Sequence, residues 1–146
     1  MTEKIKARSA QTVLSAEFTF NFDDTMVPAA GGAAVAFSTV AAHAVDVIPL
    51  PRGATVISGE VVTDTAFGGS TAINVKVGDA TSDNRYLGTT DKVTAARTAL
   101  VPTGFKSTGE ALRLTVTPTV APATAGKMTV RVQYTMEDRV SEVHIK

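Results

Sequence analysis

LPRGATVISGEVVTDTAFGGSTAINVKVGDATSDNRYL, which runs from Leu50 to Leu87, is the stretch that decides the fold. Two runs rich in β-branched residues, Ala54 to Thr63 and Thr71 to Val77, predict two β-strands. Phe67-Gly68-Gly69-Ser70 separates them and predicts a tight hairpin turn. A polar loop from Gly78 to Asn84 follows, and a short strand is expected at Arg85-Tyr86-Leu87. The stretch therefore predicts architecture and not an active site.

The two strands differ in how their apolar residues are placed. In the second strand Ile73, Val75 and Val77 alternate with polar residues, as expected when only one face is buried. The first strand has apolar residues on both faces, with Val56 and Val62 on one and Ile57 and Val61 on the other. A strand that is apolar on both faces is typical of a sheet interior. Gly59 within it predicts a bulge or the close approach of another backbone.

The same patterning extends outward in both directions. Phe18, Phe20 and Phe22 share one face of an expected strand within residues 11–22, and Asp23-Asp24 closes that strand as a turn. Leu112, Leu114 and Val116 face inward on a strand from Ala111 to Thr117, and a loop spans Pro118 to Gly126. The longest strict alternation runs from Lys127 to Glu137, and it places on one face Met128, Val130, Val132, Tyr134 and Met136. Val140, Val143 and Ile145 allow a last short strand.

The sequence of two segments is compatible with two kinds of secondary structure. Ala33 to Val40 reads as a strand or a short helix, and Val93 to Arg97 as a strand or a helical turn. His43 to Leu50 is a further apolar run. Together the segments give about eight to ten short strands with turn signals between them and no long helix, which predicts an all-β, antiparallel β-sandwich or barrel.

Length and composition set further bounds. A chain of 146 residues fits one domain, and we expect residues 1–10 to form an N-terminal arm and residues 11–146 a single β-sandwich. There is no cysteine, so disulfides and thiolate chemistry are excluded. Lys and Arg number 14, as do Asp and Glu, so the basic surplus of a nucleic-acid binder is missing. No secretory signal and no apolar run long enough to cross a membrane is recognised.

Residue patterns for catalysis are also missing. The two histidines are His43 and His144. His43 and Asp46 are three apart on an expected strand and so point to opposite faces, which is not a prebuilt catalytic pair. No nucleophile elbow, phosphate-binding loop or zinc-protease helix occurs. We therefore expect no enzyme and no cofactor.

The loop after Val77 superficially resembles a calcium-binding loop. Asp79, Thr81 and Asp83 match the first three ligand positions of an EF-hand, but the glycine and glutamate that the motif needs are replaced by Asn84 and Thr90. The favoured interpretation is a loop whose Asp and Asn side chains bond to their own backbone. Another kind of cation site at this loop stays open.

Several motifs in order resemble a known family. They are LPRGATV at 50–56, TAFGG at 65–69, VKVGD at 75–79, RYL at 85–87, ATAGK at 123–127 and the strand at 128–134. This order is similar to that of tailed-bacteriophage capsid decoration (cement) proteins of the jelly-roll type. The resemblance covers about residues 48–136.

The resemblance implies a structural virion protein with a jelly-roll-like β-sandwich of about eight strands. Such a protein binds the outside of the phage head and cements neighbouring copies of the major capsid protein. A homo-dimer or homo-trimer is implied, made in the bacterial host cytoplasm, with no nucleic acid and no membrane as partner. The alternative is a carbohydrate- or cation-binding β-sandwich module, such as a phage tail or fibre domain.

Candidate contacts with the capsid or with a second subunit lie in three places. The arm supplies basic residues two apart along the chain, the polar loop supplies side chains between two strands, and the tail supplies one cation. The residues are Lys4, Lys6, Arg8, Asp79, Asp83, Asn84 and Arg139. We expect arm and tail to pair with a neighbour by strand addition.

Overall fold

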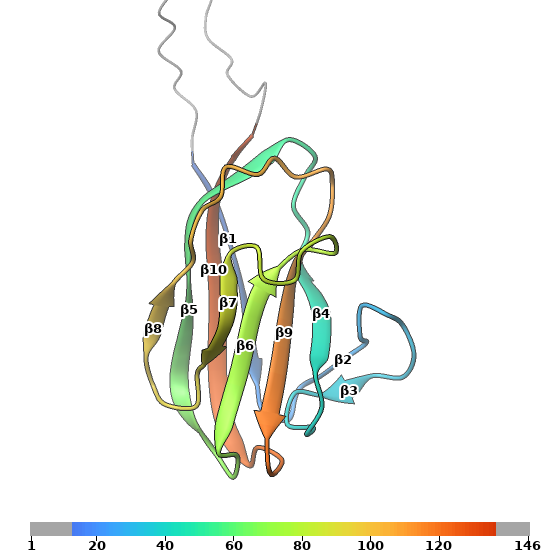
Figure 1. Ribbon diagram of the computed structural model, residues 1–146, viewed down its shortest axis with the longest axis vertical. Coiled ribbons are helices and arrows are strands. Elements are labelled where there is room, and N and C mark those ends of the chain that lie inside the picture. The colour runs from blue at the N-terminus through green and yellow to red at the C-terminus, as the bar shows by residue number, and fades with distance from the viewer. Residues whose placement is uncertain (1–12, 137–146) are drawn as a thin grey trace, which may run out of the picture.

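The structure is a computed structural model that describes residues 13–136 (Figure 1). These residues form ten strands and no helix, so the all-β prediction is confirmed. The strands are β1 (Leu14–Asn21), β2 (Thr25–Met26), β3 (Val35–Ala36), β4 (His43–Ile48), β5 (Ala54–Gly68), β6 (Ala72–Gly78), β7 (Leu87–Asp91), β8 (Arg97–Ala99), β9 (Leu112–Thr119) and β10 (Ala125–Met136). The last strand expected at 140–145 lies outside the described residues.

Eight of these strands make two four-stranded antiparallel sheets, in the orders β1-β10-β5-β8 and β4-β9-β6-β7. The pairing is nested, because β1 pairs with β10, β4 with β9, β5 with β8 and β6 with β7. A long double strand folded over into two sheets has this topology, which is that of a jelly roll. The predicted jelly-roll-like β-sandwich is therefore confirmed. β2 and β3 form a separate hairpin that projects from the body (Figure 1).

The core lies between the two sheets and follows from the period-two patterning. Alternate residues of β6, β9 and β10 point inward and are completely buried, namely Ile73, Val75, Val77, Leu112, Leu114, Val116, Met128, Val130 and Val132. Each such side chain contributes about 1.5–3 kcal/mol by leaving water. The inward positions predicted on β6 and β9 are confirmed; on β10 the predicted face also includes Tyr134 and Met136, which are partly buried against the core.

Aromatic rings close the lower end of this core. Phe18 and Phe20 of β1 lie on the inner face with ring centroids 6.0 Å apart, as predicted. Phe20 stacks on Phe37 at 4.1 Å, and Phe37 contacts the ring of His43 at 5.0 Å. Phe37 belongs to the run Ala33 to Val40, which forms β3 and a turn instead of the short helix.

The face assignment predicted for β5 is wrong in one respect. Val56 and Val61 are both buried, whereas Ile57 is 40% exposed. The reason is a register shift against β10, where Val56 opposes Tyr134 but Ser58 opposes Gln133, so Ile57 is an extra residue. A bulge of this kind reverses the alternation beyond it. β5 is nevertheless an interior strand, as predicted.

Gly59 marks a close approach rather than the bulge itself. A Cβ at Gly59 would lie 2.5 Å from the carbonyl oxygen of Arg131 and 2.7 Å from Cδ1 of Leu100. No side chain fits there without movement of β10 or of the segment after β8. The glycine therefore allows β5 to pack between its neighbours.

The hairpin predicted at Phe67-Gly68-Gly69-Ser70 is also wrong. The turn is present, but it carries the chain from one sheet to the other, because β5 pairs with β10 and β6 with β9. Gly69 has a positive φ of 82°, and the Ser70 hydroxyl donates to the Thr119 carbonyl at 2.9 Å. The hydrogen bond holds the turn against the β9–β10 connection. The hairpin next in the chain is β6–β7.

Other boundaries shift by a few residues. β9 continues through Pro118 to Thr119, two residues into the expected loop, and the strand expected at Arg85 begins at Leu87 and runs to Asp91. The open segment at Val93 to Arg97 is a bend that leads into β8. The expected turn after β1 is confirmed by the bond from the Asn21 amide to Asp24 Oδ2 at 2.7 Å.

Candidate functional site

The β6–β7 loop at the upper end of the sandwich is built around the carboxylate of Asp79. Its Oδ1 accepts the backbone N–H of Thr81 at 3.0 Å and that of Ser82 at 2.8 Å. The Asp79 N–H donates to the Ser82 carbonyl at 2.9 Å. A Cβ at Gly78 would lie 2.0 Å from that same carbonyl oxygen, so the tight turn needs a glycine there. The prediction that the loop bonds to its own backbone is confirmed.

Arg85 completes this arrangement from the far end of the loop. Its guanidinium pairs with both oxygens of the Asp79 carboxylate and lies 3.6 Å above the ring of Phe105. Burial by itself raises the pKa of Asp79, but the hydrogen bonds from Arg85, Ser82 and Thr81 outweigh it and hold the pKa below its usual value. The ion pair therefore stays charged at neutral pH.

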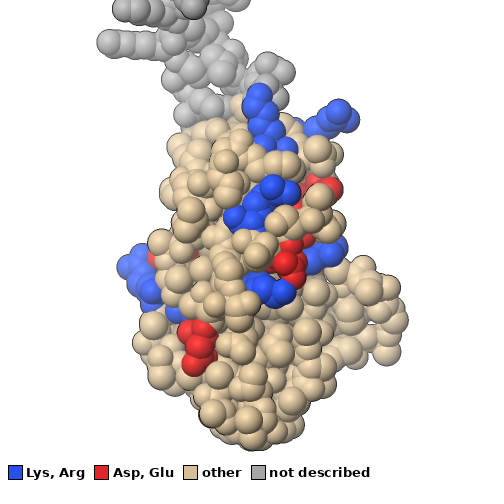
Figure 2. Space-filling model, viewed as in Figure 1, with Lys and Arg blue, Asp and Glu red and all other residues tan. Residues whose placement is uncertain are grey.

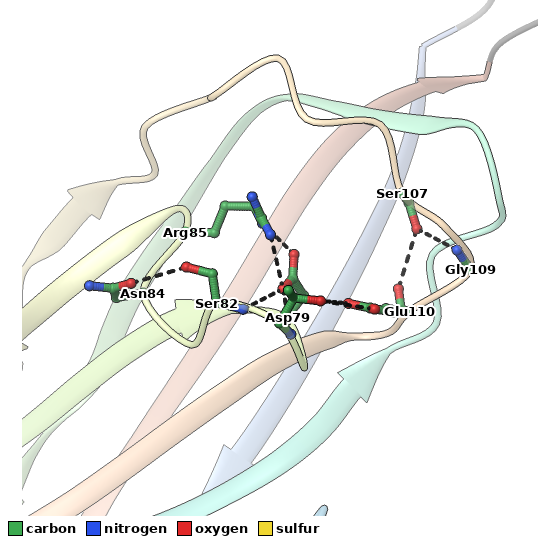
Figure 3. Close-up of polar contacts among 8 residues, drawn as sticks. Asp79, Ser82, Asn84, Arg85, Ser107, Gly109 and Glu110 are labelled. Atoms are coloured by element: carbon green, nitrogen blue, oxygen red, sulfur yellow. Dashed lines mark hydrogen bonds and ion pairs between the residues drawn. The ribbon is translucent and has the colours of Figure 1, made fainter.

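A third segment, the β8–β9 connection, joins the same network (Figure 3). The Thr81 hydroxyl donates to the Glu110 carboxylate at 3.0 Å. Ser107 Oγ accepts the Gly109 N–H at 3.1 Å and donates to the Glu110 carbonyl at 3.5 Å. The oxygen atoms that a cation would need are thus engaged by N–H and O–H donors. Within residues 13–136 no group of three or more His, Cys, Asp or Glu residues is placed to hold a metal ion.

A row of alternating charges crosses the outer face of the other sheet. Glu17 of β1 pairs with Arg131 of β10 at 3.1 Å, Arg131 pairs with Glu60 of β5 at 3.0 Å, and Glu60 accepts Nε of Arg97 of β8 at 2.8 Å. The row lines an open hollow of about 480 Å³ together with Ser15, Ala16, Ser58, Gly59, Val132 and Gln133. Because the charges alternate and pair, the row joins all four strands and leaves no single-sign field.

Two basic side chains are buried inside the sandwich. Lys92 is 1% exposed, and its ammonium donates to the Ala96 carbonyl at 2.9 Å and to Thr98 Oγ1 at 3.0 Å. His43 is 2% exposed and bonds the Met26 carbonyl through Nε2 at 3.2 Å. Burial lowers the pKa of both groups. Asp46 points outward to pair with Arg113 at 2.8 Å, so it does not pair with His43, as the strand spacing predicts.

The structure separates the residues predicted as contacts into three groups. Lys4, Lys6, Arg8 and Arg139 lie outside the described residues. Asp79 is only 4% exposed, so it shapes the loop and presents almost no surface of its own. Asp83 and Asn84 are exposed at the loop tip, where Asp83 pairs with Lys76 and Asn84 accepts the Ser82 hydroxyl at 3.2 Å. A contact role for these residues stays a prediction.

Sequence reasoning missed the charge row and the buried Lys92. Glu17, Glu60 and Arg131 sit at outward positions of long strands, which is a signal, but their pairing depends on a register between strands far apart in the chain. Lys92 follows a strand end in a polar context that gives no sign of burial. No helix in the part of the chain described is long and apolar enough to cross a membrane.

Comparisons with known proteins give a fold and no family. No protein-family model matches the chain, and no curated protein matches it. Among solved structures, a chain of the cyanophage Pam1 capsid asymmetric unit is 23% identical, with a TM-score of 0.63 over 93% of this chain and 98% of that one. A chain of the acid-stable capsid of Helicobacter pylori bacteriophage KHP30 is 17% identical, with a TM-score of 0.59 over 88% and 92%.

A chain of the Ralstonia phage GP4 capsid is similar at the same level, with 12% identity and a TM-score of 0.60 over 94% of this chain and 91% of that one. In all three cases the match covers nearly the whole of both chains. The likeness establishes a shared jelly-roll fold.

Proposed function

We propose that this protein is a structural component of a tailed-bacteriophage virion that binds the outside of the head and cements neighbouring major capsid proteins. The observation that carries the proposal is the match in fold to a chain of the Pam1 capsid, which spans 93% of this chain and 98% of that one. The capsids of two further phages contain chains of similar fold and extent. The sequence motifs at 50–87 and 123–134 favour the same role independently.

The described surface suits a protein that binds by area. A cement protein must keep its shape while it bridges subunits. The charge row across β1, β10, β5 and β8 and the Asp79 network at the upper end both join segments that are far apart in the chain. Rigid faces of this kind reduce the ordering cost of association.

The segments at 1–12 and 137–146 would supply the contacts with the shell. β1 begins at Leu14 and β10 ends at Met136, and Leu14 pairs with Tyr134, so the start of β1 and the end of β10 lie at the same end of the sandwich. The β6–β7 loop, whose exposed tip contains Asp83 and Asn84, also lies toward this upper end (Figure 1). We propose that this end faces the major capsid protein and that the protein assembles on the head as a homo-dimer or homo-trimer after synthesis in the host cytoplasm.

The test uses purified heads that lack this protein. Adding the full-length chain should give regular occupancy in electron micrographs and should raise the temperature at which the heads release their DNA. Heads that take up no protein, or take it up without a gain in stability, would overturn the proposal.

A carbohydrate-binding module is the competing function. Glycan recognition uses aromatic faces for stacking, and the lining of the hollow on the outer sheet face contains no aromatic residue. A glycan panel and calcium-dependent melting distinguish the two functions, because the cement function expects no response in either assay.

A further inference from the structure

The lower end of the sandwich carries no charged side chain over three segments of the chain. These segments, called the uncharged end, are residues 25–42, 69–71 and 119–124, and none contains Lys, Arg, Asp or Glu. In Figure 2 the projecting hairpin and the base of the molecule are free of blue and red. Asp23, Asp24 and Lys127 border the uncharged end where β1 and β10 meet.

The three segments form one continuous surface. The Ala123 N–H donates to the Ser38 carbonyl at 3.1 Å, which joins the β3–β4 loop to the β9–β10 connection. The Thr71 N–H donates to the Thr119 carbonyl at 3.2 Å, which adds the β5–β6 turn. The β2–β3 hairpin is held to the same end by the bond from the Phe37 N–H to the Asp24 carbonyl at 3.1 Å.

Val120 at the tip of this surface is strained and exposed at once. Its φ is +72°, and every other positive φ among the described residues belongs to a glycine. A β-branched residue in this region is a conformational outlier, because its Cβ crowds the backbone. The residue is 84% exposed, so its side chain gains little from packing within the described part of the chain. The backbone is held in this turn by the bond from the Ala121 N–H to the Thr119 carbonyl at 2.9 Å. Local rules are broken in this way mainly at functional positions.

Further apolar side chains lie on the same surface. Val27 in the hairpin is 55% exposed and Val40 in the loop before β4 is 44% exposed. A surface that is apolar, uncharged and bordered by charges is typical of a protein contact. It differs from the upper end, where the loops carry Arg85 and Glu110 (Figure 3).

We propose that the uncharged end is the interface between copies of this chain, with Val120 as its anchor. The argument for a second copy is charge complementarity. A charged partner surface would lose its hydration against the uncharged end and gain no ion pair in return. A second copy presents the same uncharged surface and meets no like-charge repulsion, and the chain as a whole has zero formal charge.

The interface lies away from the end proposed to face the shell, so both contacts can form together. The proposal adds a surface to the homo-oligomer named under the proposed function and rests on that part of it alone. Head binding is measured separately, so failure of one proposal is distinguishable from failure of the other.

The test measures the dissociation constant of the oligomer by sedimentation velocity, for the full-length chain and for two variants with substitutions at Val120. Val120→Asp places a charge in the interface, and Val120→Gly removes the side chain while relieving the positive φ. Each should raise the dissociation constant of the oligomer at least about tenfold, which is the size expected when one buried valine is lost. Val120→Gly should also keep or raise the melting temperature, which separates lost association from lost folding.

The matched control is Val101→Asp, because Val101 is 65% exposed and lies outside the uncharged end. It should leave the dissociation constant unchanged. Association should also persist as NaCl rises from about 0.05 to about 1 M, since no ion pair is screened. A wild-type chain that stays monomeric at about 100 μM, or Val120 variants that associate as the wild type does, would overturn the proposal.

Discussion

Asp79 and Arg85 form an ion pair beneath the β6–β7 loop, with side chains only 6% and 18% exposed respectively. The pair joins residues six positions apart and so closes the loop on itself, and the ring of Phe105 covers the guanidinium. An aspartate that looked like a cation ligand in the sequence is therefore a structural anchor. The exposed tip at Asp83 and Asn84 depends on it for its shape.

Replacing Asp79 by Asn should lower the free energy of unfolding by about 1.5–3 kcal/mol, the usual range for hydrogen bonds to a charged group. Arg85 would lose its counter-charge while remaining largely covered. Asp83→Asn is the matched control, because its carboxylate pairs with Lys76 near the surface and should contribute at most about 1 kcal/mol. Urea denaturation at pH 7 measures both. Equal losses in the two variants would contradict the anchor role.

Asp79 also predicts an acid-sensitive stability. Its folded pKa lies below the ordinary value of 3.8, so the unfolded chain binds the proton first as pH falls. The stabilisation is complete above that value and is lost as pH drops through the folded pKa. Unfolding free energies measured between pH 5 and pH 2 should fall less steeply in Asp79→Asn than in the wild type. Parallel slopes would show that other carboxylates account for the acid sensitivity.

Gly59 should be intolerant of any side chain. Gly59→Ala places a Cβ against the Arg131 carbonyl and Leu100, and overpacking of this kind costs about 1–3 kcal/mol. Gly88→Ala in β7 is the control, because a Cβ added at Gly88 would have no other atom within 4 Å. Thermal melts of the two variants should separate clearly, with Gly88→Ala at or slightly above the wild type. A tolerated Gly59→Ala would mean that β5 and β10 can move apart.

Much of this fold was predictable because apolar and polar residues alternate along the strands in the sequence. Eleven residues of β6, β9 and β10 were assigned to one face from alternation alone; nine are completely buried, and Tyr134 and Met136 at the end of β10 are partly buried against the core. Which sheet a strand joins was not predictable in the same way. A short glycine turn after β5 favours a hairpin locally, but β5 pairs with β10 and β6 with β9 instead, which are partners many residues away in the chain.

At the candidate site, too, contacts between residues close in the chain were predictable and contacts between distant residues were not. Self-bonding in the loop after Val77 was predictable because Asp79 acts on residues two and three positions away. The ion pair of Arg131 with Glu17 joins residues 114 apart and needs the register of β1 on β10. The strain at Val120 has no sequence signal, because the Thr-Val-Ala-Pro context does not require a positive φ.

His43 predicts a second pH dependence, in a higher window. Burial lowers its pKa below the ordinary 6.5, more than the bond to the Met26 carbonyl raises it. The unfolded chain therefore takes up a proton first, and stability that is complete above about pH 7 is lost as pH falls through 6.5 and below. His43→Gln should be less stable at pH 8 but should lose little more between pH 7 and pH 5. A wild-type stability that is flat over this interval would contradict the prediction.

Deleting residues 1–10 should leave the fold intact and weaken binding to phage heads. Among residues 13–136 every strand of both sheets begins at or after Leu14, so the deletion removes none of the described strands, and the melting temperature should stay within a few degrees of that of the full chain. Head occupancy should fall, because Lys4, Lys6 and Arg8 are lost as candidate contacts.

The full-length variant with these three residues changed to Ala is the control that separates their charge from strand addition by the backbone. If charge carries the contact, this variant should bind as weakly as the deletion, and wild-type binding should weaken with salt. Unchanged occupancy of the truncated chain on heads that bind the full-length protein would exclude the arm as a contact.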